Sequence, residues 1–306
     1  MVSARKDLLG IEGLGAGDIE KIFRLAGKYI DTKKNRLKPA ASLPFKGKHL
    51  FNLFFENSTR TLTSFEVAAK RMGAEVTNFN ISASSFAKGE SLKDTIYTLS
   101  AMEPDFLVVR HGQSGMPARI AAMTKCAVIN AGDGCHEHPT QALLDGFTIL
   151  QSKSRLKGLK VAICGDILHS RVARSNILLL NKMGAEVRVA APPTLMPMGV
   201  EALGVTPYLS FEKAITGVDV IILLRLQKER MQGAYMPSEA EYHYTFGLTR
   251  QRLQLAKKDA IVLHPGPINR GVEIDEDVAD DPKHSMILRQ VKNGVAVRQA
   301  VLEWLV

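Results

Sequence analysis

Short apolar runs alternate with amphipathic helical stretches along this chain, and the alternation limits the fold more than any other feature. Between the runs, apolar residues recur at helical spacing, as at Phe65, Ala68 and Met72. Runs with the length and composition of buried strands lie at residues 48–53, 76–79, 105–109, 127–130, 159–164, 186–190, 219–224 and 260–263. Such an order is typical of a parallel sheet covered by helices.

The same strand–helix pattern begins again after a polar stretch at residues 151–154. A chain of 306 residues is long enough to bury two cores. We therefore predict an α/β protein with two tandem parallel-sheet domains and helices on both faces of each sheet. Val297, Ala300 and Val301 begin an apolar helical stripe near the C-terminus, so we expect a C-terminal helix that packs back on the first domain.

Composition excludes several classes of protein. Hydrophobic residues make up 45% and charged residues 23% of the chain, as in soluble globular proteins. The longest apolar runs, such as 220–224, are too short to cross a bilayer, so we expect no membrane contact. Three cysteines form no disulfide framework, and the first ten residues contain no apolar run of signal-peptide length. We expect a cytoplasmic protein.

The formal net charge of +9 permits two interpretations. A basic surface attracts nucleic acid, but the lysines and arginines here are scattered, and only 6% of the residues are aromatic. We predict no nucleic-acid partner. A small anionic substrate explains the positive charge at least as well.

Ionisable and hydroxyl side chains follow the predicted strands directly, and we call these the strand-end residues. They are Ser58 to Thr61, Arg110, His138, Arg171, Arg225 and His264 to Pro267. In open parallel sheets, ligands bind at the carboxyl ends of the strands. Arginine suits two-pronged binding of phosphate or carboxylate, and four of these places offer one. The substrates should therefore carry several negative charges.

The stretch from Ser58 to Thr61 joins a predicted strand to a predicted helix. Free N–H groups at a helix start, two or three hydroxyls and the Arg60 guanidinium would together form an oxyanion cradle. An ordinary Ser/Thr N-cap beside a surface arginine is the alternative. The other strand-end residues favour the cradle.

Sequence patterns for cofactors are missing or incomplete. Gly165-Asp166 contains a single glycine, so the dinucleotide fingerprint is absent, and there is no Walker-type loop. Cys135, His136 and His138 resemble a zinc cluster, but no second ligand pair stands at a usual spacing. No G-x-S-x-G elbow occurs. We predict neither a metal nor an organic cofactor.

Four motifs appear in one order: Ser58-Thr59-Arg60-Thr61, His138-Pro139-Thr140-Gln141, Arg225-Leu226-Gln227-Lys228-Glu229-Arg230 and His264-Pro265-Gly266-Pro267. In this the chain resembles the aspartate carbamoyltransferase family over nearly its whole length. The resemblance implies transfer of the carbamoyl group from carbamoyl phosphate to the α-amine of L-aspartate. The products would be N-carbamoyl-L-aspartate and phosphate, in an early step of de novo pyrimidine biosynthesis.

The resemblance also implies roles for individual residues. Those for carbamoyl phosphate are Ser58, Thr59, Arg60, Thr61, Arg110, His138, Gln141, Pro265, Gly266 and Pro267, and those for aspartate are Lys88, Arg171, Arg225 and Gln227. Arg60, Thr61, Arg110 and His138 would be catalytic. Ser84 and Lys88 resemble a pair that the family donates into the neighbouring subunit's site, which implies a homotrimer with shared active sites.

With these roles we expect residues 1–139 plus 289–306 to bind carbamoyl phosphate and residues 140–288 to bind aspartate. The trimer could assemble further with regulatory chains or another pyrimidine-pathway enzyme. Two positions depart from the family pattern. Leu62 stands where many members carry a second arginine, and Gly266 stands where some relatives have leucine. Neither departure removes a side chain that the implied chemistry uses.

Two rival functions remain at this point. An ornithine-type carbamoyltransferase would share the Ser58–Thr61 cradle, but Arg225 and Gln227 favour an acidic acceptor, and the His-Cys-Leu-Pro motif of that relative is absent. A catalytically silent regulatory paralogue is the second rival. Such paralogues usually lose some of the residues that bind carbamoyl phosphate or aspartate, and this chain keeps those residues.

Overall fold

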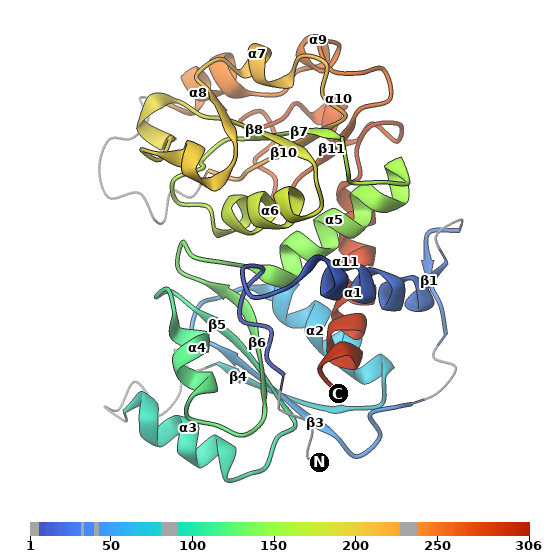
Figure 1. Cartoon of the computed structure of the whole chain (residues 1–306), viewed down its shortest axis with the longest axis vertical. Coiled ribbons are helices and arrows are strands. Elements are labelled where there is room, and N and C mark those ends of the chain that lie inside the picture. Colours follow the sequence, from blue (N-terminus) through green and yellow to red (C-terminus); the bar gives the residue numbers. More distant parts are fainter. Residues whose placement is uncertain (1–5, 32–33, 40–42, 81–90, 227–237) are drawn as a thin grey trace. The chain divides into compact units, whose positions relative to one another are not determined.

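The computed structural model describes residues 6–31, 34–39, 43–80, 91–226 and 238–306. The chain divides into two compact units (Figure 1), the first unit formed by Met1–Leu143 with Lys292–Val306 and the second unit by Leu144–Val291. Both boundaries fall inside helices, α5 (Pro139–Lys153) and α11 (Ile287–Leu305). The expected boundaries at 139/140 and 288/289 lie in the same two helices.

The first unit is built on a four-stranded parallel sheet with the order β4-β3-β5-β6. Its strands are β3 (His49–Phe54), β4 (Glu75–Asn80), β5 (Phe106–His111) and β6 (Ala127–Asp133). From β3 the chain goes to β4 on one side, and it then returns to β5 on the other side. The strand order therefore reverses between β3 and β5, which makes that pair of strand ends the topological switch point.

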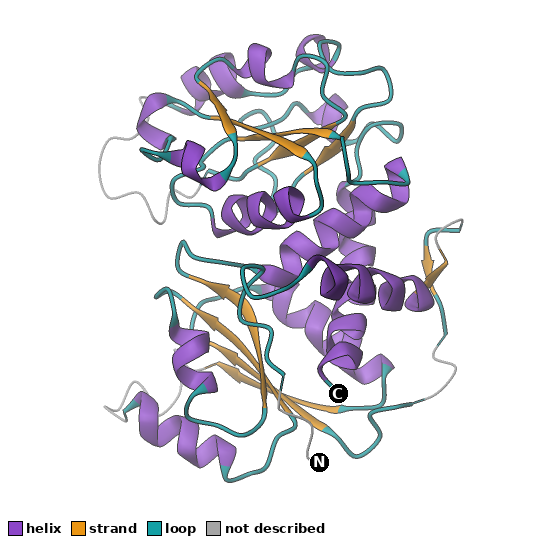
Figure 2. Ribbon diagram, viewed as in Figure 1, coloured by secondary structure: helices purple, strands orange, loops and turns teal. Residues whose placement is uncertain are grey.

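Helices cover both faces of this sheet (Figure 2). They are α1 (Ala16–Tyr29), α2 (Thr59–Arg71), α3 (Leu92–Ser100), α4 (Met116–Ala121) and part of α11. Ile96 of α3 and Ile120 of α4 pack with Phe51, Leu53 and Val109 of the strands in one apolar cluster. The alternate apolar positions of the strands thus meet the apolar stripes of the helices, as the sequence predicts.

The C-terminal helix packs on the first unit, as expected. Glu303 of α11 accepts hydrogen bonds from Lys28 Nζ (3.0 Å) and Tyr29 Oη (2.5 Å) of α1. The Arg298 guanidinium lies 4.9 Å from the ring centroid of Phe65 of α2, at cation–π distance. A short hairpin after α1, β1 (Ile30–Asp31) with β2 (Arg36–Leu37), was not predicted.

The second unit contains a five-stranded parallel sheet with the order β11-β10-β7-β8-β9. Its strands are β7 (Lys160–Cys164), β8 (Glu186–Ala190), β9 (Thr206–Tyr208), β10 (Val220–Leu223) and β11 (Ile261–Leu263). Here the order reverses between β7 and β10. Each unit therefore has one switch point in its sheet, and the prediction of two tandem parallel-sheet α/β domains is confirmed.

Besides most of α5 and the start of α11, the described helical elements of the second unit are α6 (Arg171–Lys182), η3 (Pro193–Leu195), η4 (Val200–Leu203), α7 (Phe211–Ile215), α8 (Glu239–Phe246), α9 (Arg250–Leu253) and α10 (Glu276–Ala279). α8 lies at the end of a long polar stretch of the sequence with little helical periodicity, and we did not predict it. Tyr242 and Phe246 bury one side of α8, where Phe246 meets Phe211 edge-on at 6.2 Å. Among the described residues, no helix is both long and apolar enough to span a bilayer.

Candidate active site

The strand-end residues of the first unit follow three neighbouring strands. Ser58 to Thr61 come after β3, Arg110 lies at the end of β5, and His138 comes after β6. The register places Phe54, the last residue of β3, opposite Arg110. The cradle and Arg110 therefore lie on the two strands that flank the switch point of this sheet, which is the predicted place for a ligand.

Ser58 occupies the N-cap position of α2 but does not cap the helix with its side chain. Its backbone oxygen accepts the first helical bond from Leu62 N at 3.0 Å, while its hydroxyl makes no cap hydrogen bond. The other serine and threonine N-caps among the described helices do make that bond: Ser91, Ser170, Ser210, Ser238 and Thr249. The Ser58 hydroxyl is thus not committed to the helix, and this favours the cradle interpretation over the plain cap.

Three helices open directly at the strand-end residues, and none of them carries an acidic side chain in its first turn. These helices are α2, α5 and α6. In contrast, α1, α3 and α8 begin with Asp18, Asp94 and Glu239, which offset the positive end of the helix dipole. The starts of α2, α5 and α6 keep their positive potential, as an anion-binding site requires.

Arg110 is held from two sides. Its Nη1 donates to the Ala131 oxygen of β6 at 3.2 Å, and its Nε lies 3.4 Å from Glu56 Oε2 in the turn after β3. The side chain is 14% exposed. Next to it, burial lowers the pKa of His111, so this imidazole stays neutral near neutral pH. A fixed guanidinium beside an uncharged ring can meet a developing negative charge without first reorganising.

The turn between β6 and α5 is built around the buried carboxylate of Asp133. This carboxylate accepts hydrogen bonds from Gly115 N (2.6 Å), Asn130 Nδ2 (2.8 Å) and Glu137 N (3.1 Å). The turn ends at His138, whose oxygen accepts the first helical bond of α5 from Ala142 N at 3.3 Å and a tighter turn bond from Gln141 N at 3.0 Å. His138 and Gln141 are 4% and 8% exposed. This role of Asp133 was not predicted from the sequence.

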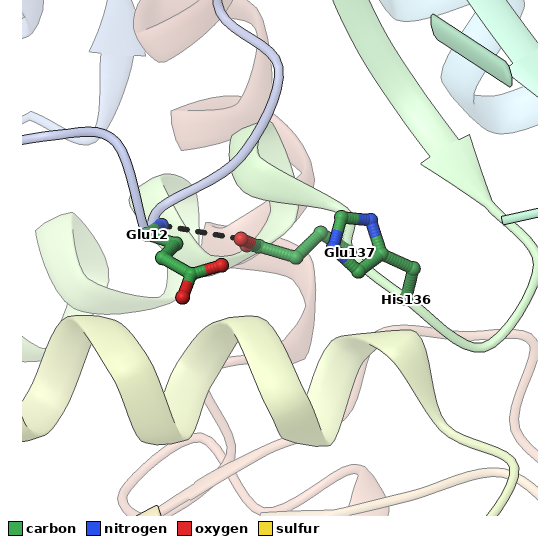
Figure 3. A group of neighbouring side chains, drawn as sticks. All are labelled: Glu12, His136 and Glu137. Atoms are coloured by element: carbon green, nitrogen blue, oxygen red, sulfur yellow. Dashed lines mark hydrogen bonds between the residues drawn. The ribbon is translucent and has the colours of Figure 1, made fainter. Parts of the chain in front are cut away.

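Glu12, His136 and Glu137 are close enough for their ligand atoms to lie within 4.8 Å of one another (Figure 3). Their contacts have another explanation. The Glu137 carboxylate accepts Ile11 N at 2.8 Å and Glu12 N at 3.2 Å, and His136 Nδ1 lies 3.0 Å from Asp133 Oδ2. The group therefore anchors residues 11 and 12 on the β6–α5 turn. It differs from the Cys135, His136 and His138 set considered above, and the absence of a metal stays a prediction.

In the second unit, the strand-end arginines flank the switch point between β7 and β10. Arg171 is the first residue of α6, after β7, and is 4% exposed, whereas Arg225 follows β10. Gly165, directly after β7, has φ +129°, and a Cβ there would lie 3.0 Å from Leu224 Cβ. Glycine is thus required where the ends of β7 and β10 approach each other.

The turn after β11 contains His264, Pro265, Gly266 and Pro267. The buried His264 donates its N–H to Gln290 Oε1 at 3.0 Å, and its Nδ1 accepts the Gly266 N–H at 2.9 Å. Gly266 has φ +64°, a left-handed conformation in which leucine would be strained. The left-handed backbone conformation therefore explains why this chain has glycine where some relatives have leucine.

A buried carboxylate links this turn to the end of β10. Glu273 accepts hydrogen bonds from Leu226 N (3.1 Å) and Asn269 N (2.8 Å), and burial raises its pKa. The two segments that carry Arg225 and the turn are thereby tied together. Three predicted site residues, Ser84, Lys88 and Gln227, lie outside the described residues.

Two family models match the chain, one over each half. Residues 6–151 match "Aspartate/ornithine carbamoyltransferase, carbamoyl-P binding domain", and residues 157–305 match "Aspartate/ornithine carbamoyltransferase, Asp/Orn binding domain". The aspartate carbamoyltransferase catalytic subunit of Parvibaculum lavamentivorans is 57% identical over 298 residues, which cover 97% of this chain and 90% of that protein. The chain belongs to the aspartate/ornithine carbamoyltransferase family.

Solved structures of the aspartate/ornithine carbamoyltransferase family include both acceptor types. Aspartate transcarbamoylase from Trypanosoma cruzi, in complex with carbamoyl phosphate and aspartate, has a TM-score of 0.85 and 31% identity, covering 99% of this chain and 98% of that chain. Ornithine carbamoyltransferase from Pyrococcus furiosus has a TM-score of 0.84 and 29% identity, covering 98% and 96%. The fold alone therefore does not distinguish an aspartate acceptor from an ornithine acceptor within this family.

Proposed function

We infer that the chain transfers the carbamoyl group of carbamoyl phosphate to the α-amine of L-aspartate, giving N-carbamoyl-L-aspartate and phosphate. The observation that carries the inference is the occupation of both switch points by anion-binding side chains. Ser58 to Thr61 and Arg110 flank one, and Arg171 and Arg225 flank the other. The choice of aspartate is supported by the curated relatives, which at 55–57% identity are named aspartate carbamoyltransferase catalytic subunits.

In the first unit, the phosphate group of carbamoyl phosphate would bind at the start of α2. There it would accept hydrogen bonds from Ser58, Thr59 and the N–H groups of the first turn, with Arg60 neutralising its charge. Thr61, Arg110 and His138 would surround the carbamoyl oxygen, with Gln141 one turn along α5. The uncommitted Ser58 hydroxyl and the fixed Arg110 guanidinium support this arrangement.

The reaction would begin when the aspartate amine attacks the carbamoyl carbon. Negative charge then develops on the carbamoyl oxygen, the bond from the carbon to the phosphate oxygen breaks, and phosphate leaves with the proton that the amine gives up. A preorganised donor to such an oxyanion typically contributes about 10²- to 10³-fold in rate. The Pro265 oxygen would orient the amine, within the turn that runs to Gly266 and Pro267. The scheme requires neither a covalent intermediate nor a cofactor.

In the second unit, Arg171 and Arg225 would bind the two carboxylates of aspartate. A guanidinium forms paired hydrogen bonds with a carboxylate, and the low exposure of Arg171 would strengthen the attraction. Ornithine has one carboxylate and a cationic side chain, so a second arginine would repel it. Gln227 and Lys88 complete the proposed aspartate site.

The decisive assay supplies purified protein with carbamoyl phosphate and either L-aspartate or L-ornithine and follows phosphate release. We expect N-carbamoyl-L-aspartate as the product, with little turnover of ornithine. Carbamoyl ornithine as the main product would contradict the acceptor assignment. No product with either acceptor would favour a silent regulatory paralogue.

The assembly is a further part of this proposal. A homotrimer in which Ser84 and Lys88 enter the neighbouring subunit's site would act in the cytoplasm at an early step of pyrimidine biosynthesis, alone or with regulatory chains or another enzyme of that pathway. Mixed trimers of Lys88→Ala and His138→Ala subunits should then regain part of the activity, because some sites would combine two intact halves. If the two kinds of subunit exchange between trimers and the mixture stays inactive, the result would argue against active sites shared between neighbouring subunits.

A further inference from the structure

A chain of buried hydrogen bonds runs from α5 to the turn after β11, entirely within the second unit. Asp145 of α5 is 0% exposed, and its Oδ1 accepts Gln290 Nε2 of α11 at 2.7 Å. Gln290, which is 3% exposed, accepts the His264 N–H with its Oε1 at 3.0 Å. His264 Nδ1 in turn accepts the Gly266 N–H at 2.9 Å.

The direction of every bond in this chain follows from the groups involved. The backbone N–H of His264 can only donate, so Gln290 must present its oxygen to it. The Gln290 amide nitrogen then faces the Asp145 carboxylate, which accepts. The other carboxylate oxygen accepts Asn176 Nδ2 of α6 at 2.8 Å, and that amide also donates to Val172 O at 3.1 Å. Each of the two side-chain amides, Gln290 and Asn176, can form these hydrogen bonds in only one orientation.

Stability alone does not account for a carboxylate in this place. Asp145 and Asn176 are both 0% exposed, and a buried charge loses its hydration. Well-packed apolar side chains are often at least as stabilising as a buried polar network of the same volume. What the network does provide is orientation, because each amide has a single way to lie.

The network ends on the backbone at both sides of Pro265. One bond fixes the N–H of His264 and the next fixes the N–H of Gly266, while Pro265 has no N–H. The Pro265 carbonyl shares its peptide group with the Gly266 N–H, which the His264 ring holds, while Gln290 holds the backbone of His264 at the start of the turn. Proper placement of reacting groups within about 1 Å can be worth 10²-fold in rate.

We propose that Asp145 and Gln290 are positioning residues for carbamoyl transfer: Asp145 orients the Gln290 amide, and Gln290 fixes the His264–Pro267 turn that would hold the attacking amine. This rests on the proposed function. Neither side chain touches substrate in this scheme, so the two act through the turn.

The first test compares Gln290→Met with Asn176→Ala. The first substitution cuts the chain between Asp145 and His264, whereas the control removes a bond to the same carboxylate without reaching the turn. We expect Gln290→Met to lower kcat by about 10- to 100-fold. Its affinity for inorganic phosphate, measured by calorimetry, should stay within about twofold, since the cradle belongs to the first unit. Asn176→Ala should lower the melting temperature and leave kcat within about threefold.

The outcomes separate this inference from the proposed function. Wild-type protein without transfer activity would defeat the proposed function, and the inference with it. Active wild-type protein with an unchanged kcat in Gln290→Met would overturn the inference alone. An equal fall of kcat in both variants would also overturn it, because the network would then act on stability only.

A second variant, Gln290→Glu, makes the test independent of how well Gln290→Met folds. Two facing carboxylates raise the pKa of one of them. When the introduced carboxyl takes up a proton, its O–H can donate to Asp145 while its other oxygen accepts the His264 N–H. The turnover of Gln290→Glu relative to wild type should therefore rise as the pH falls. A ratio independent of pH would overturn the proposal.

Discussion

Replacement of Arg60 by alanine should lower kcat/KM for phosphate release by at least about 10²-fold, as loss of one preorganised donor does in other enzymes. Arg60 lies at the start of α2, where it would neutralise the phosphate that leaves. Because its side chain is exposed, the melting temperature should barely change. Steady-state kinetics at saturating aspartate, together with thermal unfolding, would measure both effects.

The matched control is Arg24→Ala, an exposed arginine of α1 in the same unit. It removes one positive charge from the first unit without touching the turn after β3. Full activity in Arg24→Ala beside the loss in Arg60→Ala would exclude a general effect of net charge. Retention of more than about a tenth of the activity in Arg60→Ala would contradict the cradle assignment, given the size of effect expected for a single donor.

Replacement of Arg225 by alanine should act on aspartate rather than on carbamoyl phosphate. Truncating one partner of a desolvated, hydrogen-bonded ion pair typically costs about 2–5 kcal/mol, or roughly 30-fold to several thousandfold. We expect this loss in kcat/KM for aspartate, with the KM for carbamoyl phosphate within about threefold. Initial rates with each substrate varied in turn would separate the two.

Arg225→Lys and Arg155→Ala serve as controls for this prediction. Lysine keeps the charge but lacks the planar fork, so Arg225→Lys should recover only part of the aspartate kcat/KM. Arg155 is an exposed arginine of the second unit, and its removal should leave both substrates unaffected. An Arg225→Ala protein with normal aspartate kinetics would contradict the assignment of Arg225 to the aspartate site. A protein that lost only carbamoyl phosphate binding would contradict it too.

Sequence patterns predicted the two sheets and the strand-end residues because both depend on local regularities. Period-two and period-3.6 spacing give the elements, and parallel strands align their carboxyl ends at one edge. β9 was missed because it is three residues long and contains Pro207. α8 was missed because its buried side is little more than Tyr242 and Phe246 in a polar stretch.

The residues that support the site could not be found in the same way. Asp145 and Gln290 lie 145 positions apart, and nothing in the sequence near either residue indicates the other. Asp133 stands in a turn that already looked rich in ionisable groups, so its buried role was not distinguishable from an exposed one. The Ser58 N-cap shows the same limit, because the helix start was predicted but whether the hydroxyl bonds to the helix depends on its rotamer.

The return of α11 to the first unit has a consequence for how the chain is made. Lys292–Val306 belong to the first unit but follow the whole of the second unit in the sequence. During synthesis, the first unit therefore cannot complete its packing until α11 has been made, because the partners of Phe65, Lys28 and Tyr29 lie on that helix. Domains usually fold one after another as they emerge from the ribosome. Here the second unit can be completed earlier, and the unit that begins first is finished last.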